Sequence, residues 1–152
     1  KYPEKEWPFK GISYKAKFRS VTMLSNTLLR ELNKTNAIEI NPEDASYLNL
    51  KNGDTVKLIS ATGGEAVGKL LVRQGIARGT VAVAFGYGHW EYGSRTYQIG
   101  DKKISGDSTI AAGVLLSGIS LVDPTVDGIF GFSEMSTGGT SRNGGAFRIE
   151  KA

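Results

Sequence analysis

NAIEINPEDASYLNLKNGDTVKLIS, residues 36–60, is the stretch that decides the fold of this 152-residue chain. Ala37–Ile40 is a short β run. Asn41 can cap a helix, Pro42 suits its first position, and the two acidic residues that follow suit its positive first turn. The stretch therefore predicts a strand followed by a short helix that ends near Leu48.

A hairpin and a further strand follow this helix. Asn52–Asp54 has turn composition, and Thr55–Ser60 alternates apolar with polar residues as a half-buried strand does. Thr62–Gly64 predicts a tight hairpin turn into a returning strand over Glu65–Val72. Thr80–Phe85 is then a continuous apolar β run. Helix, hairpin and strand together predict a compact barrel-like unit.

The N-terminal flank predicts less regular structure. Prolines at two positions predict an irregular lead-in over residues 1–11, and a strand is expected over Ile12–Phe18. Ser25 or Asn26 can cap a short helix that runs through Leu32 and places its leucines on one face.

Past Phe85 the chain is glycine-rich. Thr96–Ile99 and Lys103–Ile104 are expected to pair across a Gly-Asp turn, and Ala146–Glu150 is expected to form the last strand. Gly138–Gly145 has the composition of a flexible loop. With 152 residues and no linker, we expect a single domain over 1–152 with one core.

Composition and charge exclude several classes of site. The chain has no cysteine, which excludes disulfides, thiolate zinc sites and iron–sulfur clusters held by this segment. Residues 1–20 carry six basic and two acidic residues, so they hold the whole net charge of +4. This basic segment is either solvated or faces phosphates. No basic stripe continues beyond it, which disfavours nucleic acid. No signal peptide or membrane span is found, and we expect a soluble segment of something longer.

No catalytic or metal-binding set is expected. His89 is the only histidine, and no G-x-S-x-G motif accompanies it. A lone loop histidine more often packs or hydrogen-bonds than catalyses. One histidine without cysteine or clustered carboxylates cannot hold zinc.

The loop GYGHWEYG, Gly86–Gly93, is the strongest candidate for ligand contact. Its Gly-X-Gly lacks the third glycine and the helix of a dinucleotide fingerprint. Glycine nevertheless lets backbone amides approach a ligand, and aromatic neighbours can stack on a planar ring. A structural loop pinned by its aromatics is an equal alternative.

Several motifs in order carry a family resemblance. Residues 36–60, Gly63-Gly64, Gly75–Gly79 and Phe85–Trp90 resemble the molybdopterin dinucleotide-binding domain that closes the catalytic subunits of the dimethyl sulfoxide reductase superfamily. Within that superfamily the loop after Phe85, together with later motifs (Gly106-Asp107, Ala112–Val114 and Asp123-Pro124), is most similar to tetrathionate reductase large subunits. The resemblance to relatives that reduce thiosulfate, polysulfide or arsenate is nearly as strong.

The resemblance implies a mainly β fold, a six-stranded double-psi β-barrel with a few short helices. It implies molybdopterin guanine dinucleotide with molybdenum or tungsten as cofactor, and an isolated domain without activity. The metal ligands and the iron–sulfur cluster would lie in preceding domains of the same subunit. The implied partners are an iron–sulfur electron-transfer subunit plus a membrane anchor subunit, and the implied location is the exported, periplasmic side of the membrane.

The resemblance also implies cofactor contacts. Arg19 would pair with a phosphate and His89 would meet the polar edge of a pterin. Ser117 falls near a position where many relatives carry asparagine, which puts that contact in doubt. The implied cofactor-binding residues are Lys15, Arg19, Ser20, Thr22, Gly86, Tyr87, Gly88, His89, Trp90, Ser117, Arg142 and Asn143.

Two rival interpretations belong to other classes. A stand-alone double-psi barrel could serve as an adaptor or binding module without a redox cofactor. A small self-processing enzyme is suggested only by Gly93-Ser94, a dipeptide common enough to occur by chance.

Overall fold

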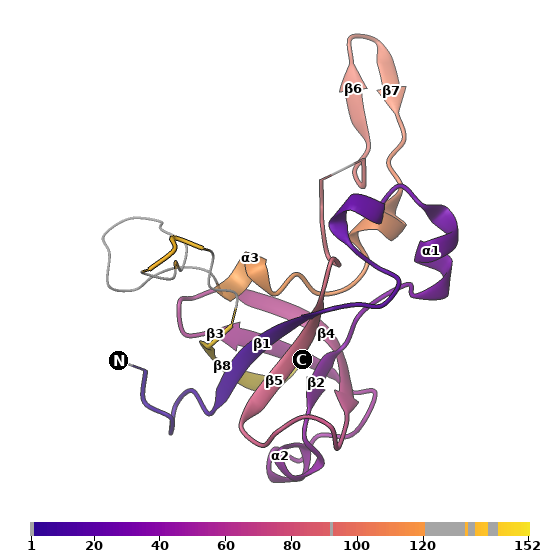
Figure 1. The fold of residues 1–152 in the computed structure, drawn as a ribbon. Coiled ribbons are helices and arrows are strands. Elements are labelled where there is room, and N and C mark those ends of the chain that lie inside the picture. The colour runs from indigo at the N-terminus through magenta and orange to yellow at the C-terminus, as the bar shows by residue number, and fades with distance from the viewer. Residues whose placement is uncertain (1, 92, 121–132, 134–135, 140–142) are drawn as a thin grey trace.

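Six strands close into a barrel in the computed structural model, which describes residues 2–91, 93–120, 133, 136–139 and 143–152 (Figure 1). Around the barrel the order is β1-β5-β2-β4-β3-β8. The β1–β5 and β2–β4 pairs are parallel and the other four are antiparallel. This arrangement confirms the predicted mainly β, six-stranded barrel. Its strands are β1 (Phe9–Lys15), β2 (Ile38–Ile40), β3 (Thr55–Ser60), β4 (Glu65–Val72), β5 (Thr80–Phe85) and β8 (Gly145–Lys151).

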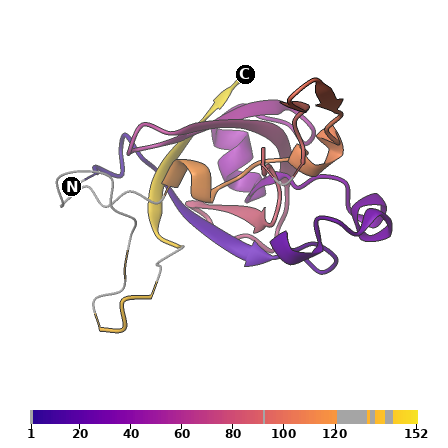
Figure 2. The same ribbon diagram turned by 90° about the horizontal axis from the view of Figure 1, so that it is seen from above.

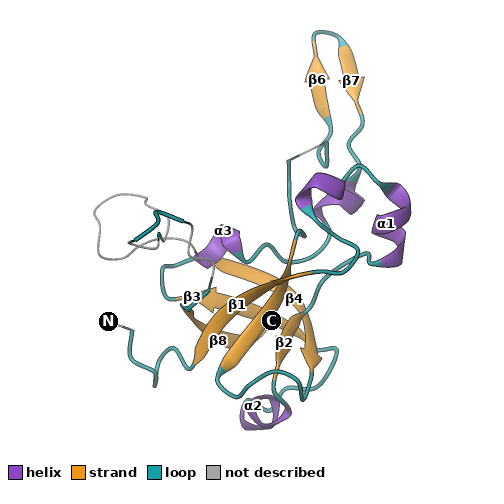
Figure 3. Ribbon diagram, in the orientation of Figure 1, coloured by secondary structure: helices purple, strands orange, loops and turns teal. Residues whose placement is uncertain are grey.

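Short helices lie at the two ends of the barrel, as Figure 3 shows. They are α1 (Thr27–Leu32), α2 (Pro42–Tyr47), α3 (Ser117–Ser120) and the 3-10 turns η1 (Val21–Met23) and η2 (Ser108–Ala111). A separate hairpin of β6 (Tyr97–Ile99) and β7 (Lys102–Ile104) confirms the predicted pairing. None of the helices in the described ranges is long and apolar enough to cross a bilayer.

The stretch that decides the fold behaves as its sequence predicts. The side-chain oxygen of Asn41 accepts a hydrogen bond from the Glu43 amide at 2.9 Å, and its Nδ2 donates to the Ile76 carbonyl at 2.7 Å. Asp44 accepts from the amide of Gly79 at 2.9 Å. The cap therefore starts α2 and also ties it to the turn before β5.

The first strand begins earlier than predicted. It runs over Phe9–Lys15, whereas the sequence favoured Ile12–Phe18, so the irregular lead-in is shorter than expected. The reason is not local, because β1 lies parallel to β5 and Lys15 is paired with Phe85, the last residue of that strand. The pairing with β5 therefore cannot continue past Lys15. At the other end Phe9 is 3% exposed, and its burial extends the strand toward the N-terminus.

The barrel interior is filled by aliphatic and aromatic side chains, most of them from alternate strand positions. Among the most buried are Ile38, Ile40, Val56, Leu58, Val81, Val83 and Phe147. Gly11 of β1 makes room for one of them, because a Cβ at Gly11 would lie 2.2 Å from the Phe147 ring. A glycine in this strand is therefore a packing requirement.

We expect Gly11→Ala to lower the free energy of unfolding by roughly 1–3 kcal/mol, because the added methyl overpacks a filled core. Urea denaturation of the wild-type and variant chains measures it. Gly75→Ala is the matched control: its Cβ would meet only Arg73 Nε, at 4.0 Å, so that variant should be neutral. Equal losses in both variants would contradict this account of the β1 glycine.

Candidate functional site

A buried arginine joins three loops at one end of the barrel. Arg19, 2% exposed, donates from Nε to the Gly86 carbonyl at 3.2 Å and from Nη2 to the Ile110 carbonyl at 3.3 Å. Its guanidinium also stacks over the Tyr87 ring, 4.9 Å from the centroid. Burial lowers the pKa of Arg19 and raises that of Tyr87. The loop after β1, the loop after β5 and η2 therefore meet at one side chain, here called the Arg19 cluster.

Two glycines let the backbones in this cluster approach closely. Gly86 and Gly88 have φ values of +94° and +71°. A Cβ at Gly88 would lie 2.6 Å from the Leu115 amide nitrogen, and one at Gly86 would lie 3.1 Å from Ser20 Cα. The backbone conformation disfavours any other residue at both positions, and at Gly88 a side chain would also collide with the neighbouring backbone. The predicted Gly-X-Gly step therefore shapes the loop against its neighbours.

Asn36 is a positioning residue that the sequence interpretation missed. This side chain, 6% exposed, donates to the carbonyls of Ala84 and Val114 at 2.8 Å and accepts from the Val114 amide at 2.7 Å. It thereby fastens the end of β5 to the segment after η2. The available signal was weak: a polar residue directly before an apolar strand.

His89 and Trp90 continue the loop after the Arg19 cluster. His89 is partly buried; burial and then the charge of Arg19 lower its pKa, while Glu91 opposes them. The imidazole is therefore neutral at pH 7. Trp90 is 45% exposed, and its carbonyl accepts a hydrogen bond from the Ser94 hydroxyl. The loop thus presents a neutral imidazole and an accessible indole.

Several of the remaining candidates lie near the end of β1. Ser20 and Thr22 share a hydrogen bond between their hydroxyls at 3.0 Å, beside the cluster. Lys15 is exposed at the last position of β1, two residues from Ser13, whose amide donates to Asn143 Oδ1 at 2.8 Å.

Among the candidates that the structure describes, Ser117 is not brought to the cluster. Ser117 is exposed at the start of α3, which lies beside the β3–β4 hairpin, at the same end of the barrel as α1 but away from it (Figures 1 and 2). Arg142 lies outside the described residues. Their predicted contacts stay predictions.

Two buried polar atoms of the cluster fit a polar ligand. Arg19 Nη1 and the Tyr87 hydroxyl have no hydrogen-bond partner among the described residues. An unsatisfied buried donor costs about 1–3 kcal/mol, so native proteins pair such groups. The predicted phosphate contact of Arg19 stays a prediction, because two of its three nitrogens already donate to carbonyls. The donor set suits an oxygen-rich polar ligand.

A polar network crosses the outer face of the barrel beside this cluster. Tyr14 of β1 donates to Glu39 of β2, and Arg73 pairs with the other carboxylate oxygen at 2.9 Å. The bridge passes over β5, where Ala82 and Ala84 leave space for it. Burial, then the hydrogen bond and charge of Glu39, raise the pKa of Tyr14 to about 12. The network lines a cavity of about 390 Å³ that Tyr87 also lines.

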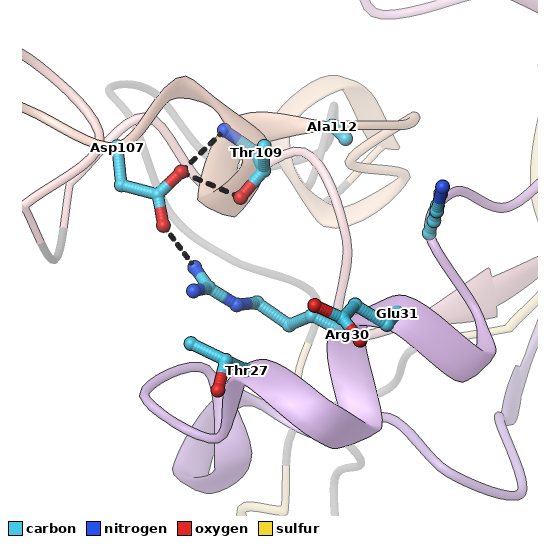
Figure 4. Close-up of a pocket in the computed structure, with 7 residues that line it drawn as sticks. Thr27, Arg30, Glu31, Asp107, Thr109 and Ala112 are labelled. Atoms are coloured by element: carbon cyan, nitrogen blue, oxygen red, sulfur yellow. Dashed lines mark hydrogen bonds and ion pairs between the residues drawn. The ribbon is translucent and has the colours of Figure 1, made fainter.

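A second cavity, of about 570 Å³, lies between α1 and η2 (Figure 4). Arg30 points across it to Asp107, with Nη1 2.8 Å from Oδ2, and Thr109 donates to the same carboxylate. Hydrogen bonds from Thr109 and then Arg30 lower the pKa of Asp107. None of the predicted cofactor residues that the structure describes lines this cavity. We interpret it as the joint that holds α1 against η2.

Comparisons with known proteins agree with this geometry. Residues 9–114 match the family described as Molydopterin dinucleotide binding domain. The chain belongs to this family. The match covers β1 to β5, both glycines of the cluster and η2, so the Arg19 cluster lies within the family's own region. The predicted family and its dinucleotide cofactor are thereby confirmed, and nothing supports the adaptor alternative.

Individual relatives extend the likeness to the whole chain. A tetrathionate reductase subunit from Salmonella typhimurium is 29% identical over 150 residues, which cover 99% of this chain and 15% of that protein. The arsenate respiratory reductase molybdopterin-containing subunit of Chrysiogenes arsenatis is 29% identical, covering 97% and 17%. Acetylene hydratase from Pelobacter acetylenicus shares the fold, with a TM-score of 0.61, 15% identity and coverage of 98% and 19%. The chain therefore spans about a sixth of the length of these two reductase proteins.

The raised pKa of Tyr14 predicts a pH-dependent stability. The pKa of the Tyr14 phenol is 10.0 in the unfolded chain and about 12 in the folded one, so the fold favours the protonated phenol. Its contribution to the free energy of unfolding is complete below pH 10 and is lost as the pH rises from 10 to 12. Urea denaturation between pH 8 and 12 should show the decline. Tyr14→Phe should reduce it, whereas Tyr47→Phe, at an 87% exposed position, should not. An unchanged decline in Tyr14→Phe would exclude this tyrosine as its source.

Proposed function

We propose that this molybdopterin dinucleotide-binding domain is the C-terminal part of the catalytic subunit of a molybdenum or tungsten reductase. The enzyme would carry a bis(molybdopterin guanine dinucleotide) cofactor and reduce an oxyanion or sulfur compound such as tetrathionate. Support comes from the tetrathionate and arsenate reductase relatives, whose likeness extends over nearly the whole chain. The cofactor would supply the redox chemistry at its metal; the residues of this domain bind and orient it.

The observation that carries the proposal is the Arg19 cluster with its two unused donors. Its loops are held rigidly by carbonyl contacts and glycine packing, yet Arg19 Nη1 and the Tyr87 hydroxyl are left for a ligand. His89 is neutral beside them and can donate or accept at a pterin edge. Trp90 can cover an apolar ring face. Such a site holds a polar, planar, oxygen-rich molecule and performs no bond-breaking step of its own.

The same proposal assigns partners and a location. Preceding domains of the subunit would hold the metal ligands and the iron–sulfur cluster. A membrane anchor subunit, together with a separate iron–sulfur subunit, would pass electrons to it. We place the complex on the exported side of the membrane, and we expect the domain by itself to show no redox turnover.

Tyr87→Phe in the full-length subunit tests the site. The hydroxyl is buried and has no partner among the described residues, so its removal should not lower the free energy of unfolding of the cofactor-free subunit and should raise it, by at most about 3 kcal/mol. Loss of a hydrogen bond to the cofactor should weaken retention roughly tenfold. Retention is measured after dialysis, as the content of guanine nucleotide and of molybdenum or tungsten per subunit.

Tyr14→Phe is the control, because it removes a hydroxyl that already has a protein partner. It should lower stability and leave cofactor retention unchanged. Equal retention in Tyr87→Phe and wild type would remove this contact from the site. A wild-type subunit that carries neither guanine nucleotide nor either metal would overturn the proposed function itself.

A further inference from the structure

The hairpin of β6 and β7 projects from the barrel. Its two strands pair with each other and with no other strand of the described chain. Figure 1 shows it standing above α1 and clear of the barrel. At about 3.3 Å per residue it extends roughly 13 Å from Thr96 to Gly100. An isolated two-stranded hairpin is marginally stable in water, so this one depends on further contacts.

One face of the hairpin is apolar. Side chains alternate along each strand, and the register places Tyr97 opposite Ile104 and Ile99 opposite Lys102. Tyr97 is 50% exposed and Ile99 is 65% exposed. The other face carries the polar pair Gln98 and Lys103. The hairpin thus presents an amphipathic surface whose apolar side has no cover in the described chain.

The base of the hairpin holds it in a set direction. A Cβ at Gly106 would lie 2.3 Å from the carbonyl carbon of Arg95, so the segment before β6 and the segment after β7 are in close contact there. The Gly106 amide donates to Thr96 Oγ1 at 3.2 Å, and the Asp107 amide donates to the Gly93 carbonyl at 2.9 Å. The apolar face is therefore presented by an anchored element.

Both ends of the hairpin lead into the proposed cofactor site. Trp90 lies just before it, and η2 just after it supplies the Ile110 carbonyl that Arg19 binds. A further domain that covers the proposed cofactor site at this end of the barrel would therefore also contact the hairpin. Each of these two relatives is more than five times as long as this chain, so a subunit of that length has enough polypeptide to form such a domain.

We propose that the Tyr97–Ile99–Ile104 face docks on the remaining polypeptide of the same subunit, on an apolar patch bearing an acidic side chain opposite Lys102. The acidic group follows from charge, since the tip carries Lys102 and Lys103 against Asp101 alone. This inference rests on the proposed function, which supplies the larger subunit. It assigns the hairpin a role as an interdomain clamp beside the cofactor.

Hydrogen exchange of the full-length subunit tests the clamp. The hairpin amides should exchange on the order of 100-fold more slowly than those of an unstructured peptide. Tyr97→Ser combined with Ile99→Ser should remove most of this protection, and Lys102→Glu should reduce it. Gln98→Ser combined with Lys103→Ser makes the same number of changes on the polar face and should preserve it.

Three results would overturn the proposal: unprotected hairpin amides in the wild-type subunit, protection that disappears on dilution, or protection that needs a second subunit. The last two would assign the face to another copy or to a partner protein. Metal and guanine nucleotide are measured on the same sample. A subunit without cofactor whose hairpin amides are still protected would contradict the proposed function and still support the docking of the hairpin.

Discussion

The buried guanidinium of Arg19 is the interaction on which the loops at this end of the barrel depend. The carbonyls of Gly86 and Ile110 belong to segments far apart in the sequence, and both receive their hydrogen bonds from this one side chain. A planar cation with several donors can serve two carbonyls and stack on Tyr87 at the same time, which an ammonium group cannot do. Asn36 performs a similar task on the other flank, using both its donor and its acceptor. The hydrogen bonds of Arg19 and Asn36 therefore fix the positions of the loops at this end of the barrel.

Parts of this structure follow from short-range chemistry and were predictable from the sequence. Asn41 caps α2 and Pro42 has the φ angle that a first helical residue needs, and both effects depend only on neighbouring residues. The hairpin turns at Gly63 and Gly100 follow from a glycine's tolerance of positive φ. Local patterns also placed β3, β4 and β5 at their observed bounds. The family resemblance added the closed barrel and the cofactor.

Other parts depend on partners distant in the chain. The bounds of β1 are set by β5, which no pattern within Ile12–Phe18 can reveal. The positive charge of Arg19 suggested a phosphate partner. Two of its nitrogens instead donate to the carbonyls of Gly86 and Ile110, which lie 67 and 91 residues further along the chain and reach Arg19 only in the folded protein. The Tyr14–Glu39–Arg73 network was not predicted for the same reason: its members come from three strands or strand ends and meet only across the closed sheet.

The last strand has a consequence for the order of events during synthesis. β8 pairs with both β1 and β3 and so closes the barrel, and Ser13 and Asn143, joined by a hydrogen bond, stand 130 positions apart. A ribosome that adds roughly 5–20 residues per second needs on the order of ten seconds to cover this distance. Until then β1 lacks one of its two neighbours, and the loop that carries Arg19 has an incomplete support. Ligand capture by this domain therefore follows its translation, and the nascent chain requires protection of its open strand edges in the meantime.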